Sequence, residues 1–437
     1  MILNILHINE LLDDCMDKEL LKVIIKEQAA MIDQKLSKEH IIERDAKLNE
    51  YLTSNIALFI LGVRRSGKST LAMQLFNGQK YGYINFDDER LFGMKANDLN
   101  SVLQAFYELY GSNLNYIILD EVQNVKSWEP FVSRLREVKR VIVTGSNSKL
   151  LSGELATRLT GRHIDFTLYP FSFSEFLRYK NVSFGSTLTT QERANVNKLL
   201  LEYLHNGGFP EFFKYGRASL ESIYNDIINR DIIQRHKIKH AEALRQIARL
   251  LISNSSQEFT YSSLKNITPI KNQITIANWV KYMEDAYLIF SVERFSYKLK
   301  NIAIAPKKGF AIDTGLVNLL GFSADKNFSR LMETCMAIEL RRRSVDGRNF
   351  SIFYWKDHKQ REVDFIIKSG DKVDQLIQVT NASSIEEVKE REIENIINAS
   401  KDLHCSNLLI ITLDYEANEH INGKAISFVP LWKWLLK

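Results

Sequence analysis

Residues 56–70 read IALFILGVRRSGKST, and this stretch decides the fold of the first part of the chain. Its first six residues are apolar without interruption, which is typical of a parallel strand buried on both faces. The next eight fit the pattern GxxxxGK[ST] in full, which marks a loop that wraps phosphate between a strand and a helix. Further runs of strand length follow at 81–86, 116–119 and 141–144, separated by patterns of helical period. Strands that alternate with helices predict an α/β domain with a parallel sheet.

The loop itself predicts a binding site for ATP and Mg²⁺. Its glycines let the backbone approach phosphate, and its N–H groups and the following helix N-terminus supply positive potential. We expect Lys68 to reach the β- and γ-phosphates, the Ser69 hydroxyl to bind Mg²⁺, and Thr70 to support the phosphate end of the loop. The other residues expected to contact the nucleotide are Gly62, Arg65, Ser66 and Gly67.

Two carboxylates, Asp120 and Glu121, directly follow the run at 116–119. A carboxylate at the carboxyl end of a neighbouring parallel strand can hold Mg²⁺, directly or through water, and we assign this role to Asp120. Glu121 comes one position later, where it can polarise the attacking water as a general base. The interpretation depends on the buried strand and the upstream phosphate loop, because an Asp-Glu dipeptide alone is common.

Polar residues also follow the run at 141–144. Asn147 can contact the γ-phosphate or the attacking water there, with a simple turn as the alternative. Arg158 and Arg162 come next, and an arginine that reaches the γ-phosphate stabilises charge in the transition state. Surface ion pairs are the alternative for each of these arginines.

The composition describes a globular chain with one basic segment. The 437 residues carry 58 basic and 53 acidic side chains, a net charge of +5. Residues 230–308 hold 14 of the basic and 6 of the acidic side chains, so this segment carries the basic character. Cys15, Cys335 and Cys405 match no metal spacing, which favours idle thiols in a reducing cytoplasm. The start turns acidic before a signal-peptide core could form, and the apolar runs are shorter than the ~20 residues of a membrane span, so we expect a soluble, cytoplasmic protein.

Nine stretches carry a resemblance to a known family. They read GVRRSGKST, YIILDEVQNVKSWE, VIVTGSNSKLLSGELATRLTGRH, LYPFSFSEF, GGFPEF, DIIQRHKI, FAIDTGL, REVDFII and VPLWKWLL. Together they resemble the prokaryotic AAA-type ATPases whose C-terminal region is a domain of unknown function, DUF4143. The resemblance covers nearly the whole chain and implies a sensor role for Asn147 and an arginine-finger role for Arg162, with Arg158 as the second candidate. Such a finger can act on the nucleotide of a neighbouring subunit, which implies a homo-oligomer.

Residues 241–295 read as helices followed by a hairpin and resemble a winged helix. The recognition-type helix would span 275–287 and the wing 290–304. The basic side chains around the wing are Arg294, Lys298, Lys300, Lys307 and Lys308. These suit contacts with DNA phosphates. However, Trp279 and Tyr287 lie on an apolar stripe that fits a core, and winged helices in ATPases often mediate only domain contacts, so DNA and protein partners both remain open.

The last third of the chain resembles the restriction-endonuclease-like fold, in which an Asp and a Glu-x-Lys pair bind a metal and activate water. The candidate residues, in chain order, are Glu333, Glu339, Asp364, Gln378 and Thr380. Gln378 stands in place of the second acid and Thr380 in place of the lysine. A neutral amide is a poor ligand for a divalent cation, and threonine places no positive charge. Lys389 and Arg391 are the candidates for a replacement cation, but we expect no nuclease activity and a fold kept for binding DNA or protein.

The sequence as a whole predicts an AAA-type P-loop α/β domain with a helical lid, then a winged-helix-like domain and an α/β nuclease-like domain. The expected segments are an N-terminal helical segment at 1–55, the ATPase domain at 56–180, the lid or linker at 181–240, the winged-helix-like domain at 241–305 and the nuclease-like domain at 306–437. The expected function is Mg²⁺-dependent ATP hydrolysis that drives or gates DNA binding. A nucleotide-gated protein-binding switch with slow turnover and an ATP-dependent nuclease are the alternatives, and no membrane partner is expected.

Overall fold

A computed structural model describes residues 16–46, 48, 51–52, 56–147, 162–185, 187–321, 328–345 and 350–437. Contacts between Cα atoms divide the chain into two compact units. The first unit comprises Met1–Gly62 and Gly67–Leu168, and the second comprises Val63–Ser66 and Tyr169–Lys437. Cys15 lies outside the described residues, whereas Cys335 and Cys405 are buried. In the ranges that the structure describes, no helix is long and apolar enough to cross a membrane.

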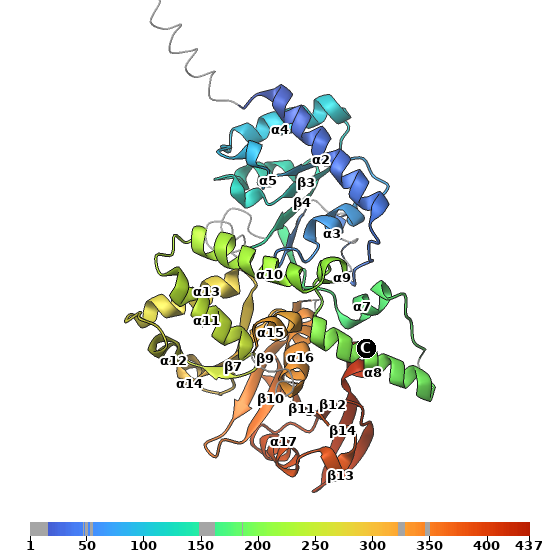
Figure 1. Ribbon diagram of the computed structural model, residues 1–437, viewed down its shortest axis with the longest axis vertical. Coiled ribbons are helices and arrows are strands. Elements are labelled where there is room, and N and C mark those ends of the chain that lie inside the picture. Colours follow the sequence, from blue (N-terminus) through green and yellow to red (C-terminus); the bar gives the residue numbers. More distant parts are fainter. Residues whose placement is uncertain are drawn as a thin grey trace, which may run out of the picture. The chain divides into compact units, whose positions relative to one another are not determined.

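The first unit is built on a five-stranded sheet (Figure 1). Its strands, in spatial order, are β2 (Tyr81–Asn85), β3 (Tyr116–Asp120), β4 (Arg140–Gly145), β1 (Ala57–Leu61) and β5 (His163–Thr167). All neighbouring pairs are parallel, so the predicted parallel sheet is confirmed. Every residue of β1 is buried, as its uninterrupted apolar sequence predicts. Because the carboxyl ends of parallel strands meet at one edge, the loops after β1, β3 and β4 lie together there.

Helices and short turns connect these strands. They are α3 (Lys68–Leu75), η2 (Glu89–Leu91), α4 (Asp98–Tyr110), η3 (Val122–Asn124) and α5 (Glu129–Leu135). A further helix, α2 (Lys18–Lys38), lies within the segment 1–55 expected to be helical, whereas the described residues 39–46 are not helical. It begins after Asp17, whose side chain accepts a hydrogen bond from Glu19 N at 3.0 Å and so caps the helix. Helix α2 buries Leu21 and Ile24 and contacts β2 and α4, which makes it part of the core of the first unit.

The second unit begins with helices. They are α7 (Phe173–Tyr179), α8 (Thr190–Asn206), α9 (Phe212–Tyr215), α10 (Arg217–Asp226), α11 (Ala241–Ser253), α12 (Tyr261–Asn266) and α13 (Gln273–Asp285). Helix α7 starts with a capping box in which Ser172 and Glu175 satisfy each other's backbone N–H groups. Helix α10 continues directly into a π-helix, η5 (Ile227–Gln234). π-helical turns are rare and occur frequently at functional sites.

A nine-stranded mixed sheet forms the rest of the second unit (Figure 1). Its strands, in spatial order, are β13 (Ala417–Ile421), β14 (Lys424–Pro430), β12 (Leu408–Thr412), β11 (Lys372–Val379), β10 (Glu362–Ser369), β9 (Ser351–Lys356), β7 (Ile289–Arg294), β8 (Lys307–Ala311) and β6 (Glu258–Phe259). The intervening helical segments are α14 (Leu299–Ile304), α15 (Thr314–Leu320), α16 (Phe328–Val345), η6 (Ile385–Glu387), α17 (Glu390–Asp402) and α18 (Leu431–Leu435). One sheet therefore crosses the boundary expected at residue 305.

The region expected to be a winged helix contributes β6 and β7 to this sheet, and β8 follows directly after it. Strand β7 pairs antiparallel with β8 and parallel with β9. The prediction of a wing over 290–304 is wrong, because residues 299–304 form helix α14 and the hairpin partner of β7 is β8. Burial explains the difference: Phe310 of β8 is fully buried, whereas Leu299 and Ile304 are exposed and gain nothing from the sheet.

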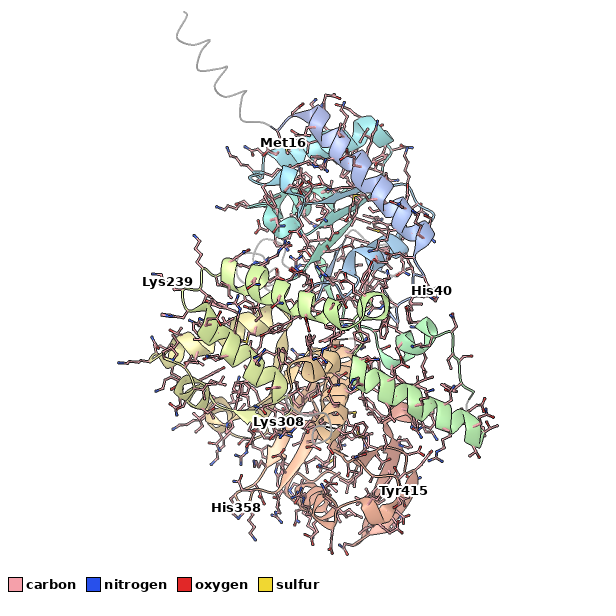
Figure 2. The ribbon with its side chains drawn as sticks, in the orientation of Figure 1. Met16, His40, Lys239, Lys308, His358 and Tyr415 are labelled. Carbon is pink, nitrogen blue, oxygen red and sulfur yellow. The ribbon has the colours of Figure 1, made fainter. Side chains whose placement is uncertain are left out.

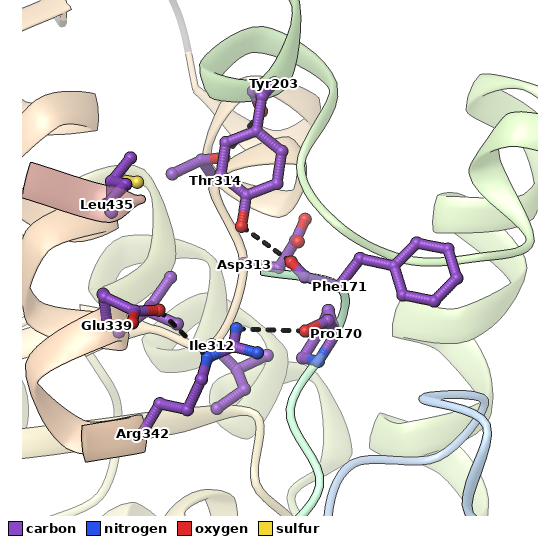
Figure 3. Close-up of a pocket in the computed structure, with 11 residues that line it drawn as sticks. Pro170, Phe171, Tyr203, Ile312, Asp313, Thr314, Glu339, Arg342 and Leu435 are labelled. Atoms are coloured by element: carbon purple, nitrogen blue, oxygen red, sulfur yellow. Dashed lines mark hydrogen bonds and ion pairs between the residues drawn. The ribbon is translucent and has the colours of Figure 1, made fainter. Parts of the chain in front are cut away.

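Three of the quoted motifs meet in the second unit, around Asp313 of FAIDTGL (Figure 3). The Oδ2 atom of Asp313 accepts from Gly208 N at 2.6 Å, and Oδ1 accepts from Gly315 N at 2.9 Å. Phe171 N in turn donates to the carbonyl oxygen of Gly208 at 2.7 Å. Burial raises the pKa of Asp313 to about 6. The cavity lined by these residues holds only about 10 Å³, the space of a single water, so the motifs join backbone segments rather than enclose a substrate.

Candidate active site

The phosphate loop joins β1 to α3, and two glycines set its shape. Gly62 has a φ of +138°, and a Cβ atom built there would lie 2.1 Å from the carbonyl oxygen of Leu168, so only glycine fits. Gly67 has a φ of +98° directly before α3, and Arg65 also has a left-handed φ of +64°. Left-handed residues within a turn direct successive N–H groups toward a common point, which makes an anion-binding concavity.

Lys68 is the first residue of α3, and its side chain is only 5% exposed. Its Nζ donates to the carbonyl oxygen of Gly62 at 3.1 Å and lies 3.9 Å from Glu121 Oε1. The ammonium group is therefore inside the loop and close to the predicted general base. The Ser69 hydroxyl is hydrogen-bonded to Asp120, so the two residues predicted to hold Mg²⁺ are in contact.

Asp120 is held by side chains from both neighbouring strands. The Tyr83 hydroxyl on β2 donates to Asp120 Oδ2 at 2.6 Å, and the Thr144 hydroxyl on β4 donates to Oδ1. Burial, followed by the charge of Glu121, raises the pKa of the Asp120 carboxyl. A divalent cation would offset both effects, so the residues present fit Mg²⁺. Tyr83 and Thr144 could not be recognised as site residues from the sequence, because only the strand order places them beside β3.

Glu121 has a φ of +54°, which is uncommon for a residue with a side chain and indicates a local constraint. Its Oε2 accepts from the backbone N and the hydroxyl of Ser146 at 3.3 and 3.2 Å. Gln123 Nε2 donates to the same oxygen. Asn147, the next residue after Ser146, is buried. The predicted base and the predicted sensor thus lie at the carboxyl ends of adjacent strands.

Helix α2 adds residues to this site that sequence analysis missed. Lys35 Nζ donates to the hydroxyl of Thr70 at 3.1 Å. A cavity of about 540 Å³ opens beside Ser69 and Asp120, and residues of α2 such as Gln28 line its other side. This volume is within the range of ordinary ligand pockets. Only the packing of α2 against β2 brings these residues to the loop, and nothing local in the sequence signals it.

Arg162 lies at the opposite edge of the sheet from the phosphate loop. Its carbonyl oxygen accepts from Ala57 N at 3.2 Å, and Ala57 pairs with His163 where the parallel strands β1 and β5 begin. The loop follows Leu61, which is about 13 Å further along β1 at a rise of ~3.3 Å per residue. An arginine-finger role for Arg162 therefore requires the nucleotide of a neighbouring subunit. Arg158 lies outside the described residues.

The second unit brings together part of the nuclease-like set. Gln378 Nε2 donates to Asp364 Oδ2 at 2.7 Å, and Thr380 is buried two residues further on. Lys308 Nζ lies 3.2 Å from Asp364 Oδ1 and 2.7 Å from Glu333 Oε1. Burial, followed by the charge of Asp364, raises the pKa of Glu333 to about 8. The cation of this cluster is thus Lys308 on β8, which sequence analysis counted among the phosphate-binding side chains.

The other candidates of that set lie elsewhere. Glu339 pairs with Arg342 at 3.1 Å and takes no part in the cluster around Lys308. Lys389 and Arg391 are exposed, so neither replaces the missing lysine. Within the described ranges, no group of three or more acidic, His or Cys side chains is arranged to hold a metal ion.

A parallel sheet with a phosphate loop after β1 and an Asp-Glu pair after β3 defines an AAA-type P-loop domain. The AAA domain family matches residues 54–177, and the domains of unknown function DUF8612 and DUF4143 match residues 197–326 and 328–434. The chain belongs to the family of prokaryotic AAA-type ATPases that carry a C-terminal DUF4143 domain, which confirms the resemblance seen in the sequence.

Relatives from an archaeon and a bacterium match nearly the whole chain. An uncharacterized protein of Methanocaldococcus jannaschii is 35% identical over 436 residues, covering 95% of this chain and 96% of that protein. An uncharacterized protein of Haemophilus influenzae is 30% identical over 419 residues, covering 91% and 98%. Among solved structures, the ORC1 protein of Aeropyrum pernix in complex with DNA covers 64% of this chain and 92% of that chain, with 11% identity and a TM-score of 0.32.

Proposed function

We propose that the chain binds ATP with Mg²⁺, hydrolyses it, and uses the cycle to gate DNA binding by the second unit. Ser69 and Asp120, already in contact, would hold Mg²⁺, which would neutralise negative charge on the phosphates. Lys68 would supply positive charge to the phosphates from inside the loop. Glu121, whose Oε2 is fixed by Ser146, would accept the proton of the attacking water.

The remaining site residues have supporting roles in this proposal. The backbone of Gly62, Arg65, Ser66 and Gly67 cradles the phosphates, and Thr70 supports the phosphate end of the loop. Asn147 senses the γ-phosphate from the end of β4. Arg162, or Arg158 in its place, acts on the nucleotide of a neighbouring copy, so the proposal includes a homo-oligomer.

The observation that carries the gating proposal is at the tip of the phosphate loop. Val63–Ser66 belong to the second unit by their contacts. Arg64 Nε pairs with Asp231 at 3.1 Å, and the Asp231 side chain is only 2% exposed. Arg65 pairs with Glu211 at 2.8 Å and with Asp226 at 2.7 Å. If phosphate binding changes the conformation of the loop, that change therefore acts directly on the ion pairs that Arg64 and Arg65 make with these three carboxylates.

The π-helix explains how two of these carboxylates serve adjacent arginines. Asp226 and Asp231 are five residues apart, on either side of the start of η5. In an α-helix, with 3.6 residues per turn, residues five apart point about 140° away from each other. A π-helix closes its hydrogen bonds between residues i and i+5, which brings such residues onto one face. The unusual helix geometry thus matches the spacing of Arg64 and Arg65.

Replacing Asp231 with asparagine should raise the KM for ATP about tenfold and change kcat much less. The variant leaves the half-buried Arg64 guanidinium without its buried counter-charge, and a hydrogen bond to a charged group contributes about 1.5–3 kcal/mol, enough for a tenfold effect. Phosphate release at varied ATP concentration measures both constants. Glu242→Gln is the matched control, because Glu242 pairs with Arg245 but is 84% exposed. Equal KM values in the two variants would remove Asp231 from the proposal.

Exposed basic residues support DNA as the partner. Lys298 and Lys300 are exposed around the start of α14, and the neighbouring Tyr297 side chain is 68% exposed. Lysines bind phosphates and an exposed aromatic ring can stack on a base. Lys308, in contrast, is buried among carboxylates and cannot contact DNA.

An electrophoretic mobility-shift assay at low salt, with and without ATP, tests this part. We expect retardation of duplex or single-stranded DNA that depends on ATP, in a Glu121→Gln background that stops turnover. Lys298→Ala combined with Lys300→Ala should weaken DNA binding at least about tenfold, because two phosphate contacts are lost. Lys372→Ala combined with Lys401→Ala is the control: it removes the same charge from other exposed positions and should leave DNA binding unchanged. If no DNA is retarded either with or without ATP, the DNA proposal is contradicted and the protein-binding switch is favoured.

A further inference from the structure

Lys308 lies in the second unit, at the position labelled in Figure 2. Its ammonium group is buried among three carboxylates. Its Nζ lies 2.6 Å from Glu362 Oε1, 2.7 Å from Glu333 Oε1 and 3.2 Å from Asp364 Oδ1. A lysine ammonium has three N–H donors, and three oxygens converge on it, so its donor capacity is filled. The Tyr354 ring, whose centroid is 5.6 Å from Nζ, adds a favourable cation–π interaction.

Charge within the cluster is not balanced by Lys308. Lys356 Nζ approaches Glu362 Oε2 at 3.3 Å, which gives two ammonium groups for three carboxylates. Lys356 also pairs with Glu258 at 2.8 Å, so two ammonium groups serve four carboxyl groups, of which Glu333, with its pKa raised to about 8, is mostly protonated at neutral pH. The site is therefore built for positive charge, and one lysine occupies its centre.

A second feature of the site is an amide oxygen. Gln378 is only 7% exposed, and its Nε2 donates to Asp364 Oδ2. Its Oε1 is buried, and no described residue donates a hydrogen bond to it. Buried polar atoms are nearly always satisfied, so this oxygen is an unused acceptor beside Asp364. Carboxylate and amide oxygens are the ligands that hard divalent cations prefer.

We propose that the ammonium of Lys308 takes the place of a divalent cation in this site, so that the native second unit binds no metal there. The three carboxylate oxygens surround one point, and the Nζ atom of Lys308 occupies that point. Divalent cations hold oxygens at about 2.1–2.6 Å. If the ammonium is removed, the oxygens of Glu333 and Glu362 need to move little to reach a metal, whereas that of Asp364, now 3.2 Å from Nζ, must move by up to about 1 Å. The native site then lacks the metal that would activate water on a phosphodiester, which assigns the C-terminal region to binding rather than cleavage.

The test measures Mn²⁺ binding to the full chain in the absence of nucleotide. The electron paramagnetic resonance signal of free Mn²⁺ reports how much of the metal remains unbound. A Ser69→Ala background removes the contribution of the phosphate loop. We expect no site in the otherwise native protein and one Mn²⁺ per chain, with a Kd on the order of 10⁻⁴ M, in Lys308→Met. Asp364→Asn added to Lys308→Met should abolish that site. Lys307→Met is the matched control, because Lys307 is adjacent on β8 but pairs with Glu293 and is 26% exposed.

Two results overturn the proposal. One is a Mn²⁺ site in the native protein that Asp364→Asn removes, because the ammonium would then not exclude the metal. The other is a folded Lys308→Met protein that binds no Mn²⁺. If Lys308→Met does not fold alone, Lys308→Gln and refolding with millimolar Mn²⁺ decide: recovery of the folded state with Mn²⁺ but not with equal ionic strength supports the proposal, and equal recovery contradicts it. Because none of these measurements uses ATP or DNA, the outcome is independent of the gating proposal.

Discussion

Replacing Lys68 with alanine should lower kcat for ATP hydrolysis by at least about 100-fold, the size of effect seen when one preorganised donor to a developing charge is lost. Lys68 is buried, and its Nζ lies within the loop between the carbonyl oxygen of Gly62 and the carboxylate of Glu121. Phosphates bound there would meet a buried ammonium group, and a charge acts more strongly in a buried position than in water. Alanine leaves no cation at that point.

Phosphate release measured in Lys68→Ala and Glu121→Gln separates binding from chemistry. Both variants should lose turnover, but Glu121→Gln should still retain ATP on a filter, because only the proton acceptor has changed. Lys80→Ala is the control, since Lys80 is an exposed lysine of the same unit. If Lys68→Ala releases phosphate at the native rate, the site is assigned to the wrong residues.

Replacing Gly207 with alanine should destabilise the second unit by roughly 2–5 kcal/mol. Gly207 ends helix α8 with φ +77° and ψ −168°, a region that only glycine occupies readily. A Cβ atom there would lie 2.0 Å from Asp313 Oδ1. Asp313 must move, and its hydrogen bonds from Gly208 and Gly315 weaken while the carboxylate stays buried, which adds about 1–3 kcal/mol to the backbone strain.

The chain provides its own control for this substitution. Gly216 ends helix α9 with φ +67° and ψ −156°, nearly the same conformation, but a Cβ atom there meets nothing within 4 Å. Gly216→Ala should therefore report the backbone strain alone, about 1–2 kcal/mol. Urea unfolding followed by tryptophan fluorescence compares the two, because four of the five tryptophans belong to the second unit. Equal urea midpoints of unfolding in the two variants would show that the contact of the new Cβ atom with Asp313 does not contribute to the loss of stability.

The features that could be predicted from the sequence depend on residues close together in the chain. The glycines, Lys68 and Ser69 form one continuous motif, and the apolar run before Asp120 identifies its strand without knowledge of the partners. The parallel arrangement follows from the alternation of strands and helices. All of these patterns are local; the strands, Gly62, Gly67, Lys68 and Ser69 lie in the first unit, whereas Val63–Ser66 belong to the second.

The features that could not be predicted depend on pairing between distant segments. The run that forms β7 looks like one strand of a hairpin, and nothing in it shows that its other edge pairs with β9, across more than 50 residues. Lys308 looks like a surface lysine, because lysines are rarely buried unless they are paired. Its carboxylate partners Glu333 and Asp364 come 25 and 56 residues later and are recognisable only in the folded chain.

The continuity of the nine-stranded sheet limits how genes of this family can recombine. The DUF8612 match ends at residue 326 and the DUF4143 match begins at 328, so a crossover between them would exchange whole domains as the family matches define them. Such a hybrid would instead inherit β6, β7 and β8 from one parent and β9 to β14 from the other. It would also combine the lysine at 308 of one parent with the carboxylates of the other. Residues 197–434 should therefore be inherited as a single module, and natural chimaeras should break before it or after it.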